Sequence, residues 1–163
     1  MPGVEVRLAR PEELGPLGDL TVTAYRADDL LVENDYYEPV LRDAARRARE
    51  AELLVAVQGD ELLGGVTYCA PPSPWCELAG PGQSEFRMLA VALTARRRGV
   101  ARALVEECIR RSRERGHSAV LLSSLPVMTG AHALYRSLGF ERTPDRDWTP
   151  APDVHLWGFR LDL

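Results

Sequence analysis

The segment Arg96-Arg97-Arg98-Gly99-Val100-Ala101 places three cationic side chains directly before a predicted helix. Apolar residues at spacings of three and four indicate that helix: Val100, Ala101, Leu104, Val105 and Cys108. The positive end of a helix dipole disfavours exposed cations by about 0.3–1 kcal/mol each. Arginines are expected at this end where an anion occupies the free amides, and Gly99 has no Cβ to keep a ligand away from the backbone. The segment therefore predicts binding of a phosphorylated molecule, with solvated surface charge as the alternative.

Length and charge restrict the class of protein. A chain of 163 residues can bury a substantial core, and we expect one domain over residues 1–163. The net charge of −4 argues against a dedicated nucleic-acid binder. The sequence shows neither a bilayer-spanning apolar run nor a signal-peptide pattern. We therefore expect a cytoplasmic protein with no membrane partner.

The cysteines and histidines do not form a metal-binding pattern. Cys69, Cys76 and Cys108 are odd in number and lack CxxC spacing, which disfavours a disulfide framework or a zinc site. The three histidines, His117, His132 and His155, stand singly, and we expect them at the surface or at helix caps. The sequence therefore predicts no bound metal.

Hydrophobic periodicity predicts a mixed α/β domain. Strands are expected at residues 4–8, 53–57, 62–68, 85–91, 119–124, 140–143 and 154–161. Helices are expected at about 11–28, 38–50 and 130–138, and directly after the arginines. Gln58-Gly59-Asp60 indicates a hairpin turn, whereas residues 70–84 form a long loop rich in Pro and Gly. A loop of that length in a compact domain favours a functional role.

Three sequence blocks carry a resemblance to a known family. They are Glu85-Phe86-Arg87-Met88-Leu89-Ala90-Val91, then Arg96-x-x-Gly99-x-Ala101, then Ala131-x-x-Leu134-Tyr135-x-x-Leu138-Gly139-Phe140. In this order and spacing the chain resembles the GNAT superfamily of acyl-CoA-dependent N-acyltransferases. The resemblance implies a central mixed, mostly antiparallel sheet, split near its middle and flanked by about four helices. It is strongest in the last two-fifths of the chain.

The resemblance implies acetyl-CoA as the acyl donor and assigns residues to it. Backbone amides of the arginine segment would hold the pyrophosphate, and main-chain groups of the strand at Leu89, Ala90 and Val91 would pair with the pantetheine arm. Either Arg98 or Arg102 would reach the 3′-phosphate. The full set of cofactor-binding residues implied is Leu89, Ala90, Val91, Arg96, Arg97, Arg98, Gly99, Val100, Ala101, Arg102 and Met128.

Two residues stand at positions that the family uses for proton transfer. Tyr135 is where many members place a general acid for the departing thiolate, and a buried packing tyrosine is the alternative. Glu85 is where several members carry a general base, which the attacking amine needs. The alternative for Glu85 is an ion pair with Arg87 or with a neighbouring strand. The expected reaction is direct attack in a ternary complex.

The chain departs from the family pattern at Met128. Many members have an asparagine there that bonds to the pantetheine, which methionine cannot do, although it can pack near the thioester. Ser123 or Ser124 at the end of the preceding strand offers a polar contact instead.

The acceptor site is expected to involve acidic and aromatic residues. The segment 28–37 holds Asp28, Asp29, Glu33, Asp35, Tyr36 and Tyr37, while Trp75 and Trp148 are expected in other loops. Such residues favour a cationic small molecule or a peptide amine, with Tyr36, Tyr37 and Trp75 as substrate-binding candidates. Solvated charge and aromatic packing are the alternative for each.

Two classes of function remain consistent with these residues. The first is an N-acyltransferase acting on a primary amine, which in this family is often a homodimer. The second is a non-catalytic acyl-CoA sensor or partner-binding module on the same fold. A dinucleotide oxidoreductase is disfavoured because no GxGxxG follows an early strand.

Overall fold

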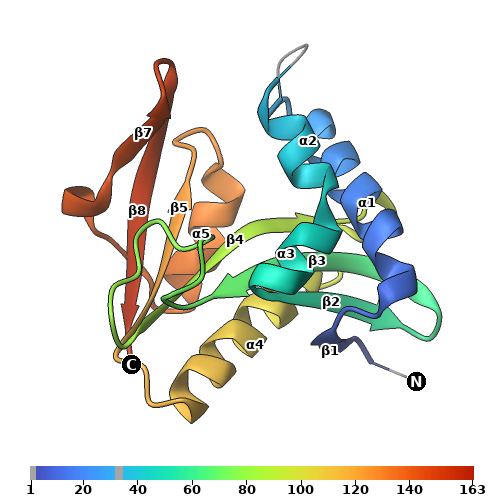
Figure 1. The fold of residues 1–163 in the computed structure, drawn as a ribbon, viewed down its shortest axis with the longest axis horizontal. Helices are drawn as coiled ribbons and strands as arrows, with labels where there is room; N and C mark the ends of the chain where they lie inside the picture. Colours follow the sequence, from blue (N-terminus) through green and yellow to red (C-terminus); the bar gives the residue numbers. More distant parts are fainter. Residues whose placement is uncertain (1–2, 32–34) are drawn as a thin grey trace. The chain divides into compact units, whose positions relative to one another are not determined.

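The computed structural model describes residues 3–31 and 35–163, which contain five α-helices and eight β-strands. The strands are β1 Glu5–Leu8, β2 Glu52–Gln58, β3 Glu61–Cys69, β4 Gln83–Val91, β5 Ala119–Ser124, β6 Glu141–Arg142, β7 Trp148–Ala151 and β8 Val154–Asp162. The helices are α1 Leu14–Ala27, α2 Tyr37–Arg42, α3 Ala44–Glu50, α4 Val100–Glu114 and α5 Thr129–Ser137 (Figure 1).

The strands form one sheet in the order β1-β2-β3-β4-β5-β8-β6, with β7 paired to β8. The β4–β5 pair is parallel, whereas β1–β2, β2–β3, β5–β8, β6–β8 and β7–β8 are antiparallel. The parallel pair joins only three residues of each strand, from Gln83–Ala119 to Glu85–Leu121. The expected mixed, mostly antiparallel α/β fold is confirmed.

The chain forms two compact units. The first contains Met1–Tyr68 and Met88–Cys108, and the second contains Cys69–Arg87 and Ile109–Leu163. Strand β4 and helix α4 each contribute to both units. Whether residues 1–163 act as one domain stays a prediction.

The core of the first unit is built on the alternation of β2. Leu53, Val55 and Val57 pack with Leu17 of α1 and Ala44 of α3, so one face of the strand is covered by these two helices (Figure 1). Gln58 pairs with Glu61 and closes the β2–β3 hairpin, whose two-residue loop contains Gly59 with φ 60°. The hairpin predicted at Gln58-Gly59-Asp60 is confirmed.

Two consecutive glycines of β3 allow helices to approach both faces of that strand. A Cβ on Gly65 would lie 2.6 Å from Leu17 Cδ1 of α1. A Cβ on Gly64 would lie 2.5 Å from the carbonyl oxygen of Ala90 and 3.2 Å from Val100 Cγ1 of α4. The start of helix α4, where the predicted anion-binding segment ends, is therefore held close to β3.

The single helix expected over residues 38–50 is wrong, because Asp43 divides it into α2 and α3. Asp43 lies between them with φ −82° and ψ 68°, and its side chain accepts a hydrogen bond from the Arg46 amide. That bond caps the N-terminus of α3. This division raises the number of helices in the described residues to five, where about four were expected.

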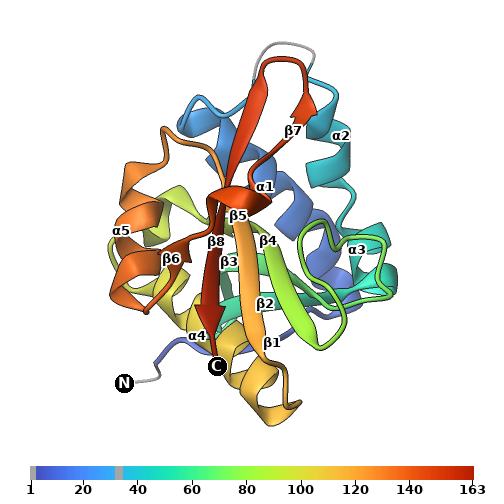
Figure 2. The same ribbon diagram turned by 90° about the vertical axis from the view of Figure 1, so that its left-hand side faces the viewer.

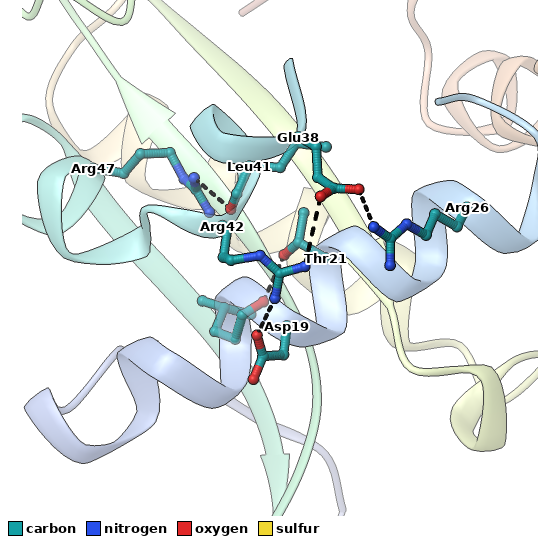
Figure 3. A network of polar contacts seen from close by, with 8 residues as sticks. Asp19, Thr21, Arg26, Glu38, Leu41, Arg42 and Arg47 are labelled. Carbon is teal, nitrogen blue, oxygen red and sulfur yellow. Dashed lines mark hydrogen bonds and ion pairs between the residues drawn. The ribbon is translucent and has the colours of Figure 1, made fainter. Parts of the chain in front are cut away.

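A buried arginine joins the two short helices. Arg47 of α3 is 1% exposed and donates through Nη1 to the carbonyl oxygens of Val40 and Leu41, at 2.7 and 2.8 Å. Figure 3 shows this contact beside a chain of ion pairs that connects α2 to α1 through Glu38 with Arg26 and Arg42 with Asp19. The last carbonyl groups of α2 thus receive hydrogen bonds from a side chain of the helix that follows it.

The second unit contains a hairpin that the sequence did not predict. Trp148, expected in a loop, begins β7, which pairs with β8 at Trp148–Leu156 and Ala151–Val154 (Figure 2). Its ring packs with Leu78, Ala119 and Leu121. Pro150 within β7 lowers the strand signal, since proline cannot donate to a ladder.

Across the described residues, none of the helices is both long enough and apolar enough to cross a membrane.

Candidate active site

The arginine segment precedes α4 as the sequence predicts, and its backbone is unusual. Helix α4 begins at Val100, and Gly99 directly before it has φ 76°. Arg97 has φ 64°, a left-handed conformation that non-glycine residues seldom adopt. Ala103 N–H donates to Gly99 O at 3.0 Å, and the amides of Val100, Ala101 and Arg102 belong to the first turn, where no intrahelical acceptor exists. The segment therefore offers amides suited to an anion.

The arginines differ in their partners. Arg96 forms two hydrogen bonds with Asp28, each 2.8 Å long, and this contact raises the pKa of the guanidinium. Arg98 hydrogen-bonds to Gln58. Arg97 has no side-chain partner among the described residues, and a Cβ on Gly99 would meet nothing within 4 Å. The residues fit a diphosphate, because the amides, an uncommitted guanidinium and open space lie together.

Strand β4 contains a backbone irregularity at Met88. This residue has φ 56° inside the strand, a left-handed conformation that non-glycine residues seldom adopt. Glu85 and Arg87 both contact segment 70–82, which joins β3 to β4. The cofactor role of Leu89, Ala90 and Val91 stays a prediction.

Glu85 is fully buried and binds the segment before it. Its Oε1 accepts three backbone hydrogen bonds, from Glu77, Leu78 and Ala79, at 2.9, 2.7 and 3.0 Å. Its Oε2 has no hydrogen-bond partner among the residues that the structure describes. Burial raises the pKa of the carboxyl above its ordinary value, although the three amide bonds and Arg87 oppose the shift. Whether this carboxyl takes part in proton transfer stays a prediction.

Arg87 pairs with the same segment and not with Glu85. Its Nη1 donates to the carbonyl oxygen of Trp75 at 3.0 Å and lies 3.7 Å from Glu77. The guanidinium lies 5.8 Å from the Trp75 ring centroid. Segment 70–82 is therefore fixed at two places on β4, by Glu85 and by Arg87.

Tyr135 lies on α5 within an aromatic cluster. It is buried, and its ring lies about 6 Å from the rings of Phe86, Phe140 and Phe159. The contact with Phe86 connects Tyr135 to the residue that follows Glu85 on β4. Both predicted proton-transfer residues therefore belong to the second unit.

His132 is a buried residue that the sequence placed wrongly at the surface or a cap. It is 3% exposed, and its ring lies 5.6 Å from Trp157 and 5.0 Å from Phe159. Burial lowers its pKa, and its Nε2 lies 3.1 Å from Ser124 Oγ. The sequence signal available was its position three residues before Tyr135, on the same face of α5.

Met128 lies beside the hydroxyl that could replace the family's asparagine. Ser124 Oγ lies 3.6 Å from Met128 Sδ, and Ser124 is buried at the end of β5. Of the two serines considered from the sequence, Ser124 is the one joined to both Met128 and His132. Its contact with a cofactor stays a prediction.

The aromatic acceptor candidates come from both units. Tyr36 is 60% exposed and contacts Tyr37, which in turn contacts Tyr25. Trp75 is buried under Arg87 in the second unit. The sequence predicts that carboxylates of segment 28–37 bind a cationic acceptor. In the structure, however, Asp28 is paired with Arg96, and Asp35 accepts a hydrogen bond from the Tyr37 amide. Glu33 lies outside the described residues.

Comparisons with known proteins identify the family and support the fold. The profile of the Acetyltransferase (GNAT) family matches residues 19–140. Rat N-acetyltransferase 8F1 is 30% identical over 92 residues, which cover 56% of this chain and 40% of the rat protein. The chain therefore spans less than half the length of that relative.

Solved structures share the fold. A GNAT-family acetyltransferase from Staphylococcus aureus superposes with a TM-score of 0.77 at 12% identity, covering 99% of each chain. A putative acetyltransferase from Salmonella typhimurium, solved with its cofactor acetyl-CoA, gives 0.71 at 16% identity over 99% of this chain and 94% of that one. The fold and the family match together define the class of protein. This chain belongs to the GNAT acetyltransferase family.

Proposed function

We propose that this protein transfers an acetyl or related acyl group from acyl-CoA to a primary amine, by direct attack in a ternary complex. Family membership supports the reaction class. The observation that carries the proposal is Glu85, whose Oε1 is held by three amides while its buried Oε2 is unpaired. A carboxylate fixed in this way is oriented before any ligand arrives.

The arginine segment would hold the diphosphate of CoA. The first-turn amides of α4 supply donors, and Arg97 supplies a positive charge that no described side chain neutralises. CoA, when bound, supplies the activated thioester. Arg98 or Arg102 would serve the 3′-phosphate, in competition with Gln58 and Glu106 respectively.

Glu85 would accept the proton of the attacking amine. Burial raises the pKa of its carboxyl toward neutral pH, which is the direction a general base needs. Its three amide partners occupy Oε1, so the buried Oε2 is the oxygen that the amine or an intervening water would have to reach. Tyr135 would donate a proton to the departing thiolate, since a phenol is a good donor against an apolar wall.

The acceptor would be a small amine or an exposed peptide amine. Tyr36 and Tyr37 provide aromatic faces for a cation, and Trp75 would act through segment 70–82. Acidic residues would contribute less to binding of a cationic acceptor than the sequence predicts, because Asp28 is paired with Arg96.

Thiol release from acetyl-CoA across a panel of amines and peptides tests the function. We expect acceptor-dependent release, and a fall of about 100-fold or more in kcat for Glu85→Gln, which keeps the side-chain shape but removes the base. Cys76→Ser should retain turnover, because direct attack needs no thiol intermediate. CoA binding by calorimetry without acceptor-dependent release would instead support the acyl-CoA-binding module.

A further inference from the structure

Two thiols meet next to Glu85. Cys69 is the last residue of β3 and Cys76 lies in segment 70–82, and their side chains hydrogen-bond to each other. Cys69 Sγ also lies 3.5 Å from the backbone oxygen of Glu85. All three cysteines are free thiols, and Cys108 lies on α4, buried.

The two thiols differ in accessibility and in the direction of their pKa shifts. Cys69 is buried, whereas Cys76 is partly exposed. Their hydrogen bond lowers the pKa of Cys76 and raises that of Cys69, and Arg87 favours the thiolate of Cys76 while Glu85 and Glu77 oppose it. A partly exposed thiol with a lowered pKa beside a buried thiol suits thiol–disulfide exchange.

We propose that Cys76 and Cys69 form a redox-modification site that reacts with small disulfides of the glutathione class. The Cys76 thiolate attacks one sulfur of the oxidised glutathione, forming a mixed disulfide and releasing one glutathione thiolate. Cys69 then loses its proton and attacks the Cys76 sulfur, and the second glutathione leaves as a thiolate and is protonated. Two cysteine thiols are oxidised to one disulfide, and one oxidised glutathione is reduced to two glutathione molecules.

The site is joined to the Glu85 carboxyl through the backbone. Cys76 directly precedes Glu77, whose amide is the first of the three that bind Glu85 Oε1. Closing the disulfide draws Cys76 toward Cys69, so it displaces the Glu77 amide relative to Glu85. Oxidation of the thiol pair should therefore change the hydrogen exchange of the three amides at Glu77, Leu78 and Ala79.

Intact-mass measurement after thiol alkylation tests the site without reference to acetyl transfer. The reduced protein is incubated with oxidised glutathione and alkylated, and its mass is measured both intact and after digestion. We expect two fewer alkylated cysteines and a linked peptide pair containing Cys69 and Cys76. Hydrogen exchange of the amides at residues 77–79 should change on oxidation and return after reduction with dithiothreitol.

Three variants assign the roles of the thiols. Cys69→Ser should accumulate a stable glutathione adduct at Cys76, and Cys76→Ser should lose no alkylatable thiol beyond the one replaced. Cys108→Ser is the matched control and should form the Cys69–Cys76 link as the wild type does. Persistence of all three thiols in the wild type, or a link that involves Cys108, would overturn the proposal. Peptide mapping of the wild type shows which cysteines are linked, even where a variant fails to fold.

Discussion

Arg96 holds Asp28 through two parallel hydrogen bonds, both 2.8 Å long. The guanidinium nearest the start of the arginine segment is therefore committed to the end of α1, because Asp28 is the residue that follows that helix. A bound diphosphate would compete with Asp28 for this guanidinium. The pair lies at the surface, so its net contribution is small, about 0–1 kcal/mol.

Asp28→Asn should tighten CoA binding by up to about fivefold, because it frees Arg96 for the ligand, at a gain of no more than the pair's 1 kcal/mol. Calorimetry at two ionic strengths measures the change, and the gain should shrink with added salt. Asp29→Asn removes the same charge one residue away and is the matched control. Equal effects of both variants would show that Asp28 acts only through net charge.

The pH dependence of stability should reveal the buried carboxyl of Glu85. Its pKa is raised on folding, so between the ordinary value of 4.5 and the raised value the native state keeps a proton that the unfolded state has lost. Stability must fall as pH rises through that window. Chemical denaturation should show the wild type losing stability relative to Glu85→Gln from about pH 4.5 upward. A constant difference between the two proteins across pH 4 to 8 would contradict the shift.

Tyr135→Phe should lower kcat by about 100-fold or more while CoA affinity changes less than twofold, if the phenol is the general acid. The ring contacts with Phe86 and Phe140 survive this change, so the free energy of unfolding should fall by only about 1 kcal/mol. Steady-state kinetics and calorimetry measure the two quantities. Tyr68→Phe, at a buried tyrosine of β3, serves as the control. A rate equal to the wild type would leave Tyr135 with packing alone.

Arg47→Met should lower the free energy of unfolding by about 2–4 kcal/mol, because it leaves the carbonyls of Val40 and Leu41 without their donor in a buried place. Urea denaturation measures the loss. Arg49→Met changes an exposed arginine of the same helix and should stay within about 0.5 kcal/mol of the wild type. Comparable losses in both variants would mean that helix charge, and not the buried contact, is responsible.

Local patterns predicted most of the fold. The strand at residues 119–124 and the turn at Gln58-Gly59-Asp60 match β5 and the β2–β3 hairpin, because alternation and turn residues are local signals. Asp43 was misplaced inside a helix because the apolar repeat continues across it. Its capping bond to the Arg46 amide was a signal that residue type and spacing could have supplied. Strand β7 was not predicted because it contains Pro150, and proline is unfavourable in a strand.

The candidate site was predicted by position and not by contacts. The resemblance located Glu85 and Tyr135, yet the three amides at Glu85 come from segment 70–82, whose path no periodicity encodes. His132 was missed for the same reason, since its stacking partners Trp157 and Phe159 belong to β8. Contacts between distant segments decide burial, and single-sequence patterns do not contain them.

The bonding of Glu85 Oε1 to Glu77, Leu78 and Ala79 has a consequence for protein engineering. Residues 70–82 cannot be exchanged for the loop of a relative as an independent cassette, because their shape depends on a carboxylate from a different strand. A chimaera that imports this loop should also import the strand residue that organises it, or the grafted segment will lose its conformation.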